Sequence, residues 1–325
     1  MKLKIFKLAI LSLAITSVSC AFAQTPAQPN KILHVAYEAP DDGFDMVKTT
    51  NFYSGSIAEA IFEPLLKYDY LARPVQLVPY TAESLPKVEQ DGKVYTFKIK
   101  SGIYFTNDPS FKGKRRELVA EDYVYAIKRI LDPENRAPSV SFIEGKLLGA
   151  DVVVAKAKKT GKFDYAAPIA GVKALDRYTL QLTLTRQDFN FPYILAYISF
   201  GGVAKEVVDY YGDRIGMHPV GTGPYMLSKY VPRSKVELVA NPDYRGFLWN
   251  FKSTGTPWDN QLVKEMSGKK MPQIGKVVVS IIEEQQSRWL AFQSGQLDFD
   301  RLTANAVPQA LDKGQLKASF QKKRN

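Results

Sequence analysis

Cysteine and histidine are almost absent from this sequence of 325 residues. The only cysteine, Cys20, excludes an intramolecular disulfide and a cluster of thiolate metal ligands. The two histidines, His34 and His218, are too few for a histidine-rich metal site. The serine motif Gly-x-Ser-x-Gly and the zinc motif His-Glu-x-x-His are also missing. We therefore expect no bound metal, no cofactor and no enzymatic activity of these classes.

Long apolar runs are also scarce. The run at residues 8–18 is too short to span a bilayer, so we expect no permanent membrane helix there. Hydrophobic residues make up 45% of the chain and charged residues 24%, which is typical of soluble globular proteins. This composition excludes a disordered chain and a protein with several membrane spans. At roughly 150 residues per domain, the length predicts two domains.

The N-terminus is typical of a secretory signal. Three lysines precede the apolar run, and Ala21-Phe22-Ala23 then offers a small-x-small cleavage site before Gln24. We predict a signal peptide at residues 1–23, a polar linker at 24–31 and a periplasmic location. The alternative is a lipid anchor on Cys20, although the residues before it lack the large aliphatic side chain of a lipoprotein signal.

Basic residues are in excess, with 44 Lys+Arg against 33 Asp+Glu and a net charge of +11. Export argues against nucleic acid as a partner, and the charge is dispersed along the chain. The only dense internal cluster, at residues 112–116, is best explained as a solvated loop. Attraction to an anionic envelope surface is the more plausible use of the excess charge.

Residue periodicity predicts a mixture of strands and helices without strict alternation. The clearest helix spans residues 120–131, where apolar residues form one stripe between an acidic first turn and a basic last turn. Further helices are predicted at 54–62 and 285–294. Strands are predicted at 32–37, 95–99 and 277–282, and hairpins at 172–185 and 225–239.

Three segments invite a catalytic or nucleotide-binding interpretation that we disfavour. The Gly-Thr-Gly-Pro segment at 221–224 lacks the third glycine and the Lys-Ser/Thr pair of a phosphate loop, so we predict a structural turn. Glu283 and Glu284 are adjacent and would point to opposite faces of a strand. Asp298 and Asp300 share a face of an extended chain, but nothing nearby indicates acid–base chemistry.

Short motifs occur along the chain from about residue 32 to residue 300. They are Ile61-Phe62-Glu63-Pro64-Leu65-Leu66, Thr96-Phe97-Lys98-Ile99-Lys100-Ser101-Gly102, Ala120-Glu121-Asp122-Tyr123-Val124-Tyr125, Gly171-Val172-Lys173-Ala174-Leu175-Asp176, Pro219-Val220-Gly221-Thr222-Gly223-Pro224-Tyr225, Asn241-Pro242-Asp243-Tyr244 and Gly295-Gln296-Leu297-Asp298. In this order and approximate spacing they resemble family 5 of the bacterial extracellular solute-binding proteins. These are the peptide-binding components of ABC importers.

The resemblance implies an α/β fold with mixed sheets, a two-lobed clamp of the periplasmic-binding-protein type that carries an extra domain on its first lobe. It assigns residues 32–62 and 171–275 to the first lobe and 63–170 to the extra domain. Residues 276–325 would begin the second lobe, most of which we expect to be missing from this N-terminal portion of the family's length.

The function implied is capture of an oligopeptide or similar small solute and its delivery to an ABC permease in the inner membrane. Backbone contacts would hold ligands of many sequences, and a monomer is expected. The resemblance and the unusual aromatic pair before the first helix suggest six ligand-binding residues. They are Asn51, Phe52, Tyr53, Phe142, Phe200 and Gly201.

Two other functions stay open on the sequence. A secreted hydrolase of envelope polymers would need a nucleophilic serine or a carboxylate pair, and no such arrangement is evident. A peptide-binding chaperone or sensor without a transport function would carry the same sequence features.

Overall fold

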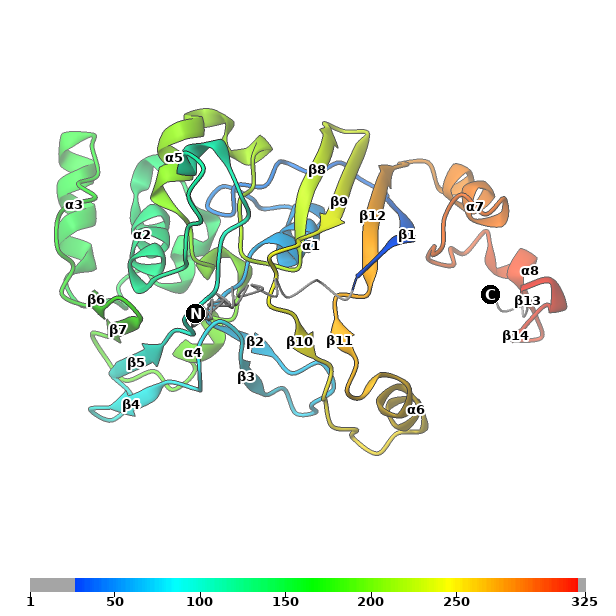
Figure 1. The fold of residues 1–325 in the computed structure, drawn as a ribbon, viewed down its shortest axis with the longest axis horizontal. Helices are drawn as coiled ribbons and strands as arrows, with labels where there is room; N and C mark the ends of the chain where they lie inside the picture. The colour runs from blue at the N-terminus through cyan, green and yellow to red at the C-terminus, as the bar shows by residue number, and fades with distance from the viewer. Residues whose placement is uncertain (1–26, 321–325) are drawn as a thin grey trace, which may run out of the picture.

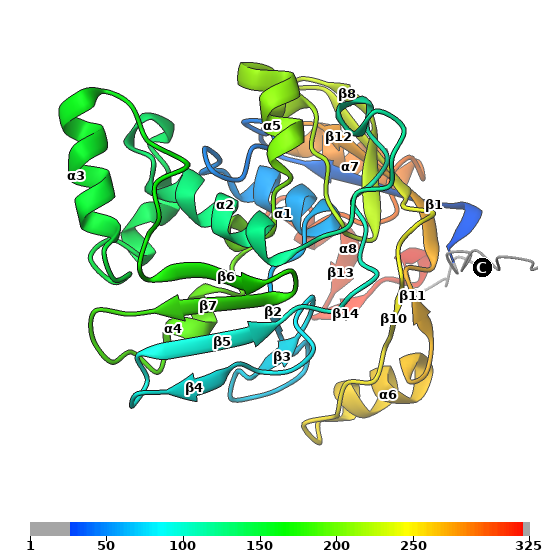
Figure 2. The same cartoon turned by 60° about the vertical axis from the view of Figure 1, so that its left-hand side comes forward.

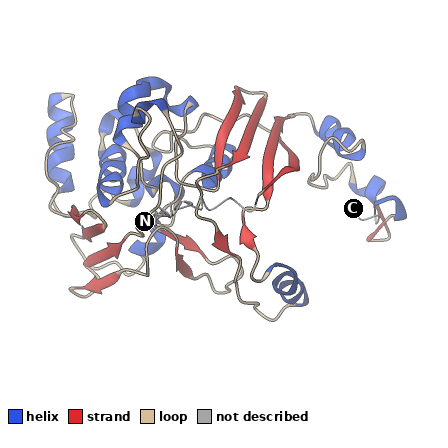
Figure 3. Ribbon diagram, viewed as in Figure 1, coloured by secondary structure: helices blue, strands red, loops and turns tan. Residues whose placement is uncertain are grey.

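The computed structural model describes residues 27–320, so the predicted signal peptide, Cys20 and residues 24–26 lie outside the described part. Strands and helices are mixed along the chain, as Figure 3 shows. Within the described part, no helix has both the length and the apolar content that crossing a bilayer demands.

The first sheet brings the N-terminal strand together with three strands from the C-terminal half of the chain. Its strands are β1 (Gln28–Tyr37), β12 (Ile274–Ile281), β9 (Lys235–Ala240) and β8 (Tyr225–Val231), in that order (Figure 1). β1 runs parallel to β12, and the other neighbours are antiparallel. Val35, Val279 and Val236 lie side by side across the sheet and share a core with Ile57 and Ile61 of helix α1 (Phe52–Ile61).

The second sheet is antiparallel throughout and contains β4 (Lys87–Glu89), β5 (Val94–Lys98), β7 (Thr179–Thr183) and β6 (Val172–Asp176), in that order. Helix α2 (Ala120–Leu131) packs against β6 and β7, as Figure 2 shows. The larger core lies between them and includes Tyr95, Phe97, Tyr123, Ile127 and Leu180.

Most of the predicted elements are confirmed. The helix predicted at 120–131 has those bounds, and the hairpins appear as β6–β7 and β8–β9. The N-terminus of α2 is closed by Asp122, whose carboxylate accepts the backbone N–H of Val119 at 2.8 Å. The predicted local features therefore agree with the fold.

The remaining elements are short. The helices are α3 (Ala150–Thr160), α4 (Phe191–Ile194), α5 (Lys205–Tyr211), α6 (Pro257–Met266), α7 (Gln285–Gln293) and α8 (Val307–Ala310). The strands are β2 (Leu66–Tyr68), β3 (Leu77–Pro79), β10 (Phe247–Leu248), β11 (Lys270–Met271), β13 (Leu311–Asp312) and β14 (Gln315–Leu316). Six 3₁₀ turns complete the described chain, at Pro109–Phe111, Pro133–Asn135, Pro138–Phe142, Ile198–Phe200, Gly212–Met217 and Ala318–Phe320.

The predicted linker differs from the structure. β1 begins at Gln28, so the later part of the expected linker at 24–31 is strand. The reason is that Gln28 and residues 32–37 pair with β12, which extends the strand toward the N-terminus. The predicted division into two lobes and an extra domain stays a prediction.

Candidate functional site

Three of the motifs meet at one buried carboxylate. The side chain of Glu63 is fully buried and accepts two hydrogen bonds from Arg245, at 2.7 and 2.9 Å. Thr222 donates to the same carboxylate at 2.9 Å and Tyr244 at 3.3 Å. Glu63, Thr222 and Tyr244 belong to the motifs at 61–66, 219–225 and 241–244, and Arg245 directly follows the last of them. The three motifs therefore meet in a buried hydrogen-bond network that stabilises the fold, and they do not form a ligand pocket.

The predicted turn at 221–224 lies directly against the end of α1. The N–H of Gly223 donates to the carbonyl of Ile61 at 2.8 Å, and a Cβ at Gly223 would lie 2.7 Å from the carbonyl oxygen of Ala60. A Cβ at Gly221 would overlap the carbonyl oxygen of Ile61. Both glycines are therefore explained by close backbone approach, as the structural interpretation predicted.

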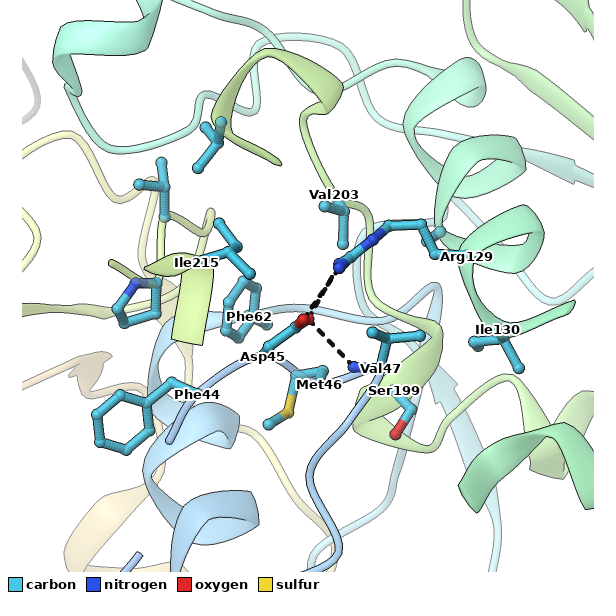
Figure 4. Close-up of a pocket in the computed structure, with 14 residues that line it drawn as sticks. Phe44, Asp45, Met46, Val47, Phe62, Arg129, Ile130, Ser199, Val203 and Ile215 are labelled. Carbon is cyan, nitrogen blue, oxygen red and sulfur yellow. Dashed lines mark hydrogen bonds and ion pairs between the residues drawn. The ribbon is translucent and has the colours of Figure 1, made fainter. Parts of the chain in front are cut away.

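A small cavity beside a buried ion pair is not a ligand site. Arg129 of α2 donates to both carboxylate oxygens of Asp45 at 3.0 Å, and each side chain is 7% exposed (Figure 4). The adjoining cavity has a volume of about 30 Å³, which suits one water molecule. This pair instead ties the segment after β1 to the larger core.

A much larger pocket, of about 360 Å³, lies between the first sheet, α1 and the chain after α7. We call it the sheet–helix pocket. Its floor is the apolar face of the sheet, one wall is α1, and the other wall is formed by Arg288 and residues 299–303. Its lining residues are Leu33, Val35, Ala36, Tyr37, Glu38, Phe52, Tyr53, Ser56, Ile57, Ala60, Tyr225, Leu238, Val277, Val279, Arg288, Phe299, Asp300, Arg301 and Thr303.

The outer wall is fixed to the edge of β1 by Asp298. Its backbone N–H donates to the carbonyl of His34, and its carboxylate accepts the N–H of His34, both at 2.8 Å. Asp298 thus occupies the place of a neighbouring strand at this point of the edge. Phe299 and Asp300 follow at once and are held against the pocket.

A line of polar groups crosses one end of the otherwise apolar pocket. The hydroxyl of Tyr53 donates to Glu38 at 3.0 Å, and Arg288 reaches the other oxygen of Glu38 at 3.2 Å. Desolvation and the Glu38 carboxylate raise the pKa of Tyr53 above its ordinary value of 10.0. Tyr53 therefore keeps its proton at neutral pH and acts as a donor.

Two of the six predicted ligand-binding residues line this pocket. The ring of Phe52 is 68% exposed at the start of α1, and the ring of Tyr53 packs on Tyr37 with centroids 4.9 Å apart. The side chain of Asn51 is instead the N-cap of α1, accepting from Tyr53 N at 2.7 Å and donating to the carbonyl of Pro40 at 2.8 Å. Asn51 positions the two aromatic residues and does not line the pocket.

The other three predicted residues lie elsewhere. Phe200 is 2% exposed and belongs to the larger core, because the chain there turns inward beneath α2. Gly201 packs against the backbone carbonyls of Ile198 and Glu63. Phe142 forms an edge-to-face pair with Tyr197, with centroids 5.6 Å apart, outside the residues that line the sheet–helix pocket.

Sequence reasoning missed Glu38, Arg288 and the wall at 299–303. The sequence offers Asp298 and Asp300 only as a carboxylate pair, whereas the structure places Asp298 at the edge of β1 and Asp300 in the pocket lining. No local sequence pattern identifies Arg288 as a pocket residue. One of its partners, Glu38, is 250 positions away, and the other, Asp300, lies beyond the end of α7. Among residues 27–320, no group of three acidic, histidine or cysteine side chains has a metal-binding arrangement.

Chemically, the pocket combines an apolar floor with a few fixed polar groups, which is the usual composition of a site for a small organic ligand. The outer edge of β1 adds backbone groups beyond Asp298. The N–H and C=O of His34 point away from β12 and are bound to Asp298, and strand alternation directs the N–H and C=O of Ala36 to the same side.

The sequence matches the family model described as bacterial extracellular solute-binding proteins, family 5 Middle, over residues 76–325. Di/tripeptide-binding protein 2 of Pseudomonas aeruginosa is 30% identical over 234 residues, which is 69% of this chain and 40% of that protein. The dipeptide-binding protein of Escherichia coli is 26% identical over 258 residues, or 76% of this chain and 44% of the relative. The chain thus spans less than half the length of these relatives.

Solved structures share the fold. The substrate-binding domain of an oligopeptide ABC transporter from Bacillus anthracis aligns with a TM-score of 0.66 at 24% identity, over 86% of this chain and 46% of that one. Listeria monocytogenes OppA bound to peptide also aligns with a TM-score of 0.66, at 20% identity, over 87% of this chain and 48% of that one. The expected periplasmic-binding-protein fold is thereby confirmed for a part of its usual length. The chain belongs to family 5 of the bacterial extracellular solute-binding proteins.

Proposed function

We propose that this protein captures oligopeptides in the periplasm and delivers them to an ABC permease, without chemically altering them. Support comes from the relatives named for di- and tripeptides and from the sheet–helix pocket beside an open strand edge. The predicted signal at residues 1–23 supports export.

Main-chain pairing explains how peptides of many sequences bind one site. A ligand strand placed beside Ala36 on the outer edge of β1 pairs its own N–H and C=O groups with that residue. Phe52 and Tyr53 then cover the ligand from α1, and side chains rest on the apolar floor. The affinity comes from backbone groups that every peptide shares.

Closure of the clamp follows from the position of the outer wall. Residues 299–303 come after the last strand of the first sheet, where the family resemblance places the passage toward a second lobe. A ligand that touches both β1 and this wall stabilises the closed arrangement, because only that arrangement contacts it from both sides. We propose that the permease recognises this closed form of a monomer.

A second ligand class is favoured by the apolar floor. A probable deoxycholate-binding periplasmic protein of Escherichia coli is 28% identical over 225 residues, or 69% of this chain and 39% of that protein. An amphiphilic steroid acid would use the apolar floor without strand pairing.

Native mass spectrometry of the protein purified from the periplasm separates these functions. We expect short peptides of mixed sequence to co-purify. A single homogeneous steroid-like or other non-peptide ligand would refute the peptide assignment and keep the solute-binding class.

Substitution of Phe52 tests the location of the site. Because its ring is 68% exposed, Phe52→Ala should weaken peptide binding about tenfold with little change in melting temperature, as measured by calorimetry. Phe189→Ala is the matched control, since Phe189 is 59% exposed and lies outside the pocket lining. Equal affinities of the two variants would place the peptide elsewhere.

A further inference from the structure

Two loops lie side by side next to helix α6, which is at the edge of the molecule in Figures 1 and 2. One loop contains residues 70–76 and connects β2 to β3, and the other contains residues 251–258 and leads from β10 into α6. The rings of Tyr70 and Phe251 are in contact, with centroids 5.9 Å apart, and join the two loops. We call this pair of loops the double-loop tip.

The exposed charges of the double-loop tip are positive. Its two charged residues, Arg73 and Lys252, are both basic and exposed. The acids that flank the loops are bound locally. Asp69 accepts two backbone N–H groups of its own loop, each at 2.9 Å, and Asp259 accepts the N–H of Thr254 at 3.2 Å.

Three large apolar side chains are exposed on the same two loops. Trp258 is 62% exposed, Tyr70 is 56% exposed and Val75 is 52% exposed. The other two tryptophans of the chain, Trp249 and Trp289, are 7% and 3% exposed. Packing within the fold therefore explains Trp249 and Trp289 but not Trp258.

The backbone that carries Trp258 is held in place. The hydroxyl of Thr256 caps α6 by accepting the N–H of Asp259 at 3.1 Å, and Pro257 occupies the first turn. Trp258 is therefore presented to solvent from the start of a capped helix.

Exposed aromatic and basic side chains on neighbouring loops match the chemistry of a lipid surface. Tryptophan and tyrosine prefer the interface between water and lipid, because they combine an apolar ring with a polar group. Lysine and arginine are attracted to anionic phospholipid headgroups. A stable protein interface uses about 20–30 residues on each side, more than these two loops supply.

We propose that the double-loop tip binds the surface of a membrane containing anionic phospholipids, with Trp258 and Tyr70 at the level of the headgroups. This inference goes beyond the proposed function, since Trp258, Tyr70, Arg73 and Lys252 are not among the residues that line the sheet–helix pocket. Binding of this kind concentrates the protein at a membrane surface.

Vesicle binding by the protein purified from the periplasm tests the proposal. Tryptophan fluorescence is recorded with vesicles of equal parts phosphatidylcholine and phosphatidylglycerol, and with vesicles of phosphatidylcholine alone. We expect binding to the anionic vesicles, weakened by added salt, and a shift of the emission to shorter wavelength. Because Trp249 and Trp289 are already buried, the shift reports the environment of Trp258.

Trp258→Ala should weaken binding to the anionic vesicles about tenfold, as measured by co-sedimentation, because it removes the largest exposed apolar side chain of the tip. Its melting temperature should change little, since the ring is mostly exposed. Phe189→Ala is the matched control, because Phe189 is 59% exposed and lies outside both loops.

The double variant Arg73→Gln/Lys252→Gln should lose most of the preference for anionic vesicles. Lys112→Gln/Lys114→Gln removes the same charge from another exposed loop and should keep that preference. All variants share the same N-terminus, so differences among them report the double-loop tip.

Absence of wild-type binding to the anionic vesicles would overturn the inference, and this is the result expected if the tip contacts a protein partner instead. Equal binding by Trp258→Ala and Phe189→Ala, or equal wild-type binding to both kinds of vesicle, would overturn it as well. Peptide affinity should be the same in Trp258→Ala and the wild type, so the proposed function stands or falls separately.

Discussion

Glu63 shows at the scale of one residue how a motif serves stability. A fully buried carboxylate is tolerated only when its charge and lone pairs are matched, and Arg245, Thr222 and Tyr244 match them here. The Glu63 carboxylate in turn raises the pKa of Tyr244, after the larger effect of burial. The residue is thus a structural anchor between distant segments.

Glu63→Gln should therefore destabilise the protein by about 3 kcal/mol, because Arg245 is left facing a neutral group in a buried site. Urea denaturation followed by circular dichroism measures the free energy of unfolding. Glu134→Gln, at an exposed position, is the control and should stay within about 0.5 kcal/mol of the wild type. A loss for Glu63→Gln as small as that of the control would contradict an anchoring function.

At the scale of elements, α1 and the turn at 221–224 constrain each other's position through close backbone contact. The turn has no room for a Cβ where it meets the last residues of α1, whereas Gly55 within α1 faces open space. Asn51 fixes the start of the helix and thereby sets where Phe52 and Tyr53 enter the pocket. The geometry of the candidate site thus depends on a helix whose two ends are both constrained.

Alanine substitutions at two glycines should have opposite effects. Gly221→Ala should cost about 1–3 kcal/mol through overpacking against Ile61. Gly55→Ala should stabilise by about 0.5–1 kcal/mol, because alanine is the better helix former and meets no neighbour. Thermal unfolding of both variants provides the measurement, and a stable Gly221→Ala protein would disprove the close approach.

At the scale of the whole molecule, a buried ion pair lies at the junction of the two larger apolar cores of the described chain. Phe44 and Met46 belong to the core under the first sheet, while Val47 already belongs to the core beneath α2. Asp45 lies between them in sequence and pairs with Arg129. We therefore expect this buried pair to stabilise the junction between the two cores.

Asp45→Asn should lower the free energy of unfolding by about 3 kcal/mol, since it leaves Arg129 buried without its counter-charge. Urea denaturation followed by circular dichroism measures this loss. Asp151→Asn, at the exposed start of α3, should stay within about 0.5 kcal/mol of the wild type. An unchanged free energy of unfolding in Asp45→Asn would show that the pair does not stabilise the junction between the cores.

The sequence by itself determined the local elements and the family. The helix at 120–131, the two hairpins and the turn at 221–224 follow from side-chain periodicity, capping residues and glycines, which act over a few positions. The aromatic pair at Phe52 and Tyr53 was also predictable, because a polar stretch precedes it, although only Phe52 is exposed and Tyr53 is half-buried.

Only the tertiary structure decided which distant residues share a site. His34 and Asp298 are 264 positions apart, and Glu38 meets Arg288 over 250 positions. Such contacts depend on the parallel register of β1 with β12, which no local pattern specifies. Phe200 was predicted to bind ligand for the same reason. A phenylalanine in the sequence is equally compatible with a core or a cleft, and only the tertiary packing places Phe200 in the larger core.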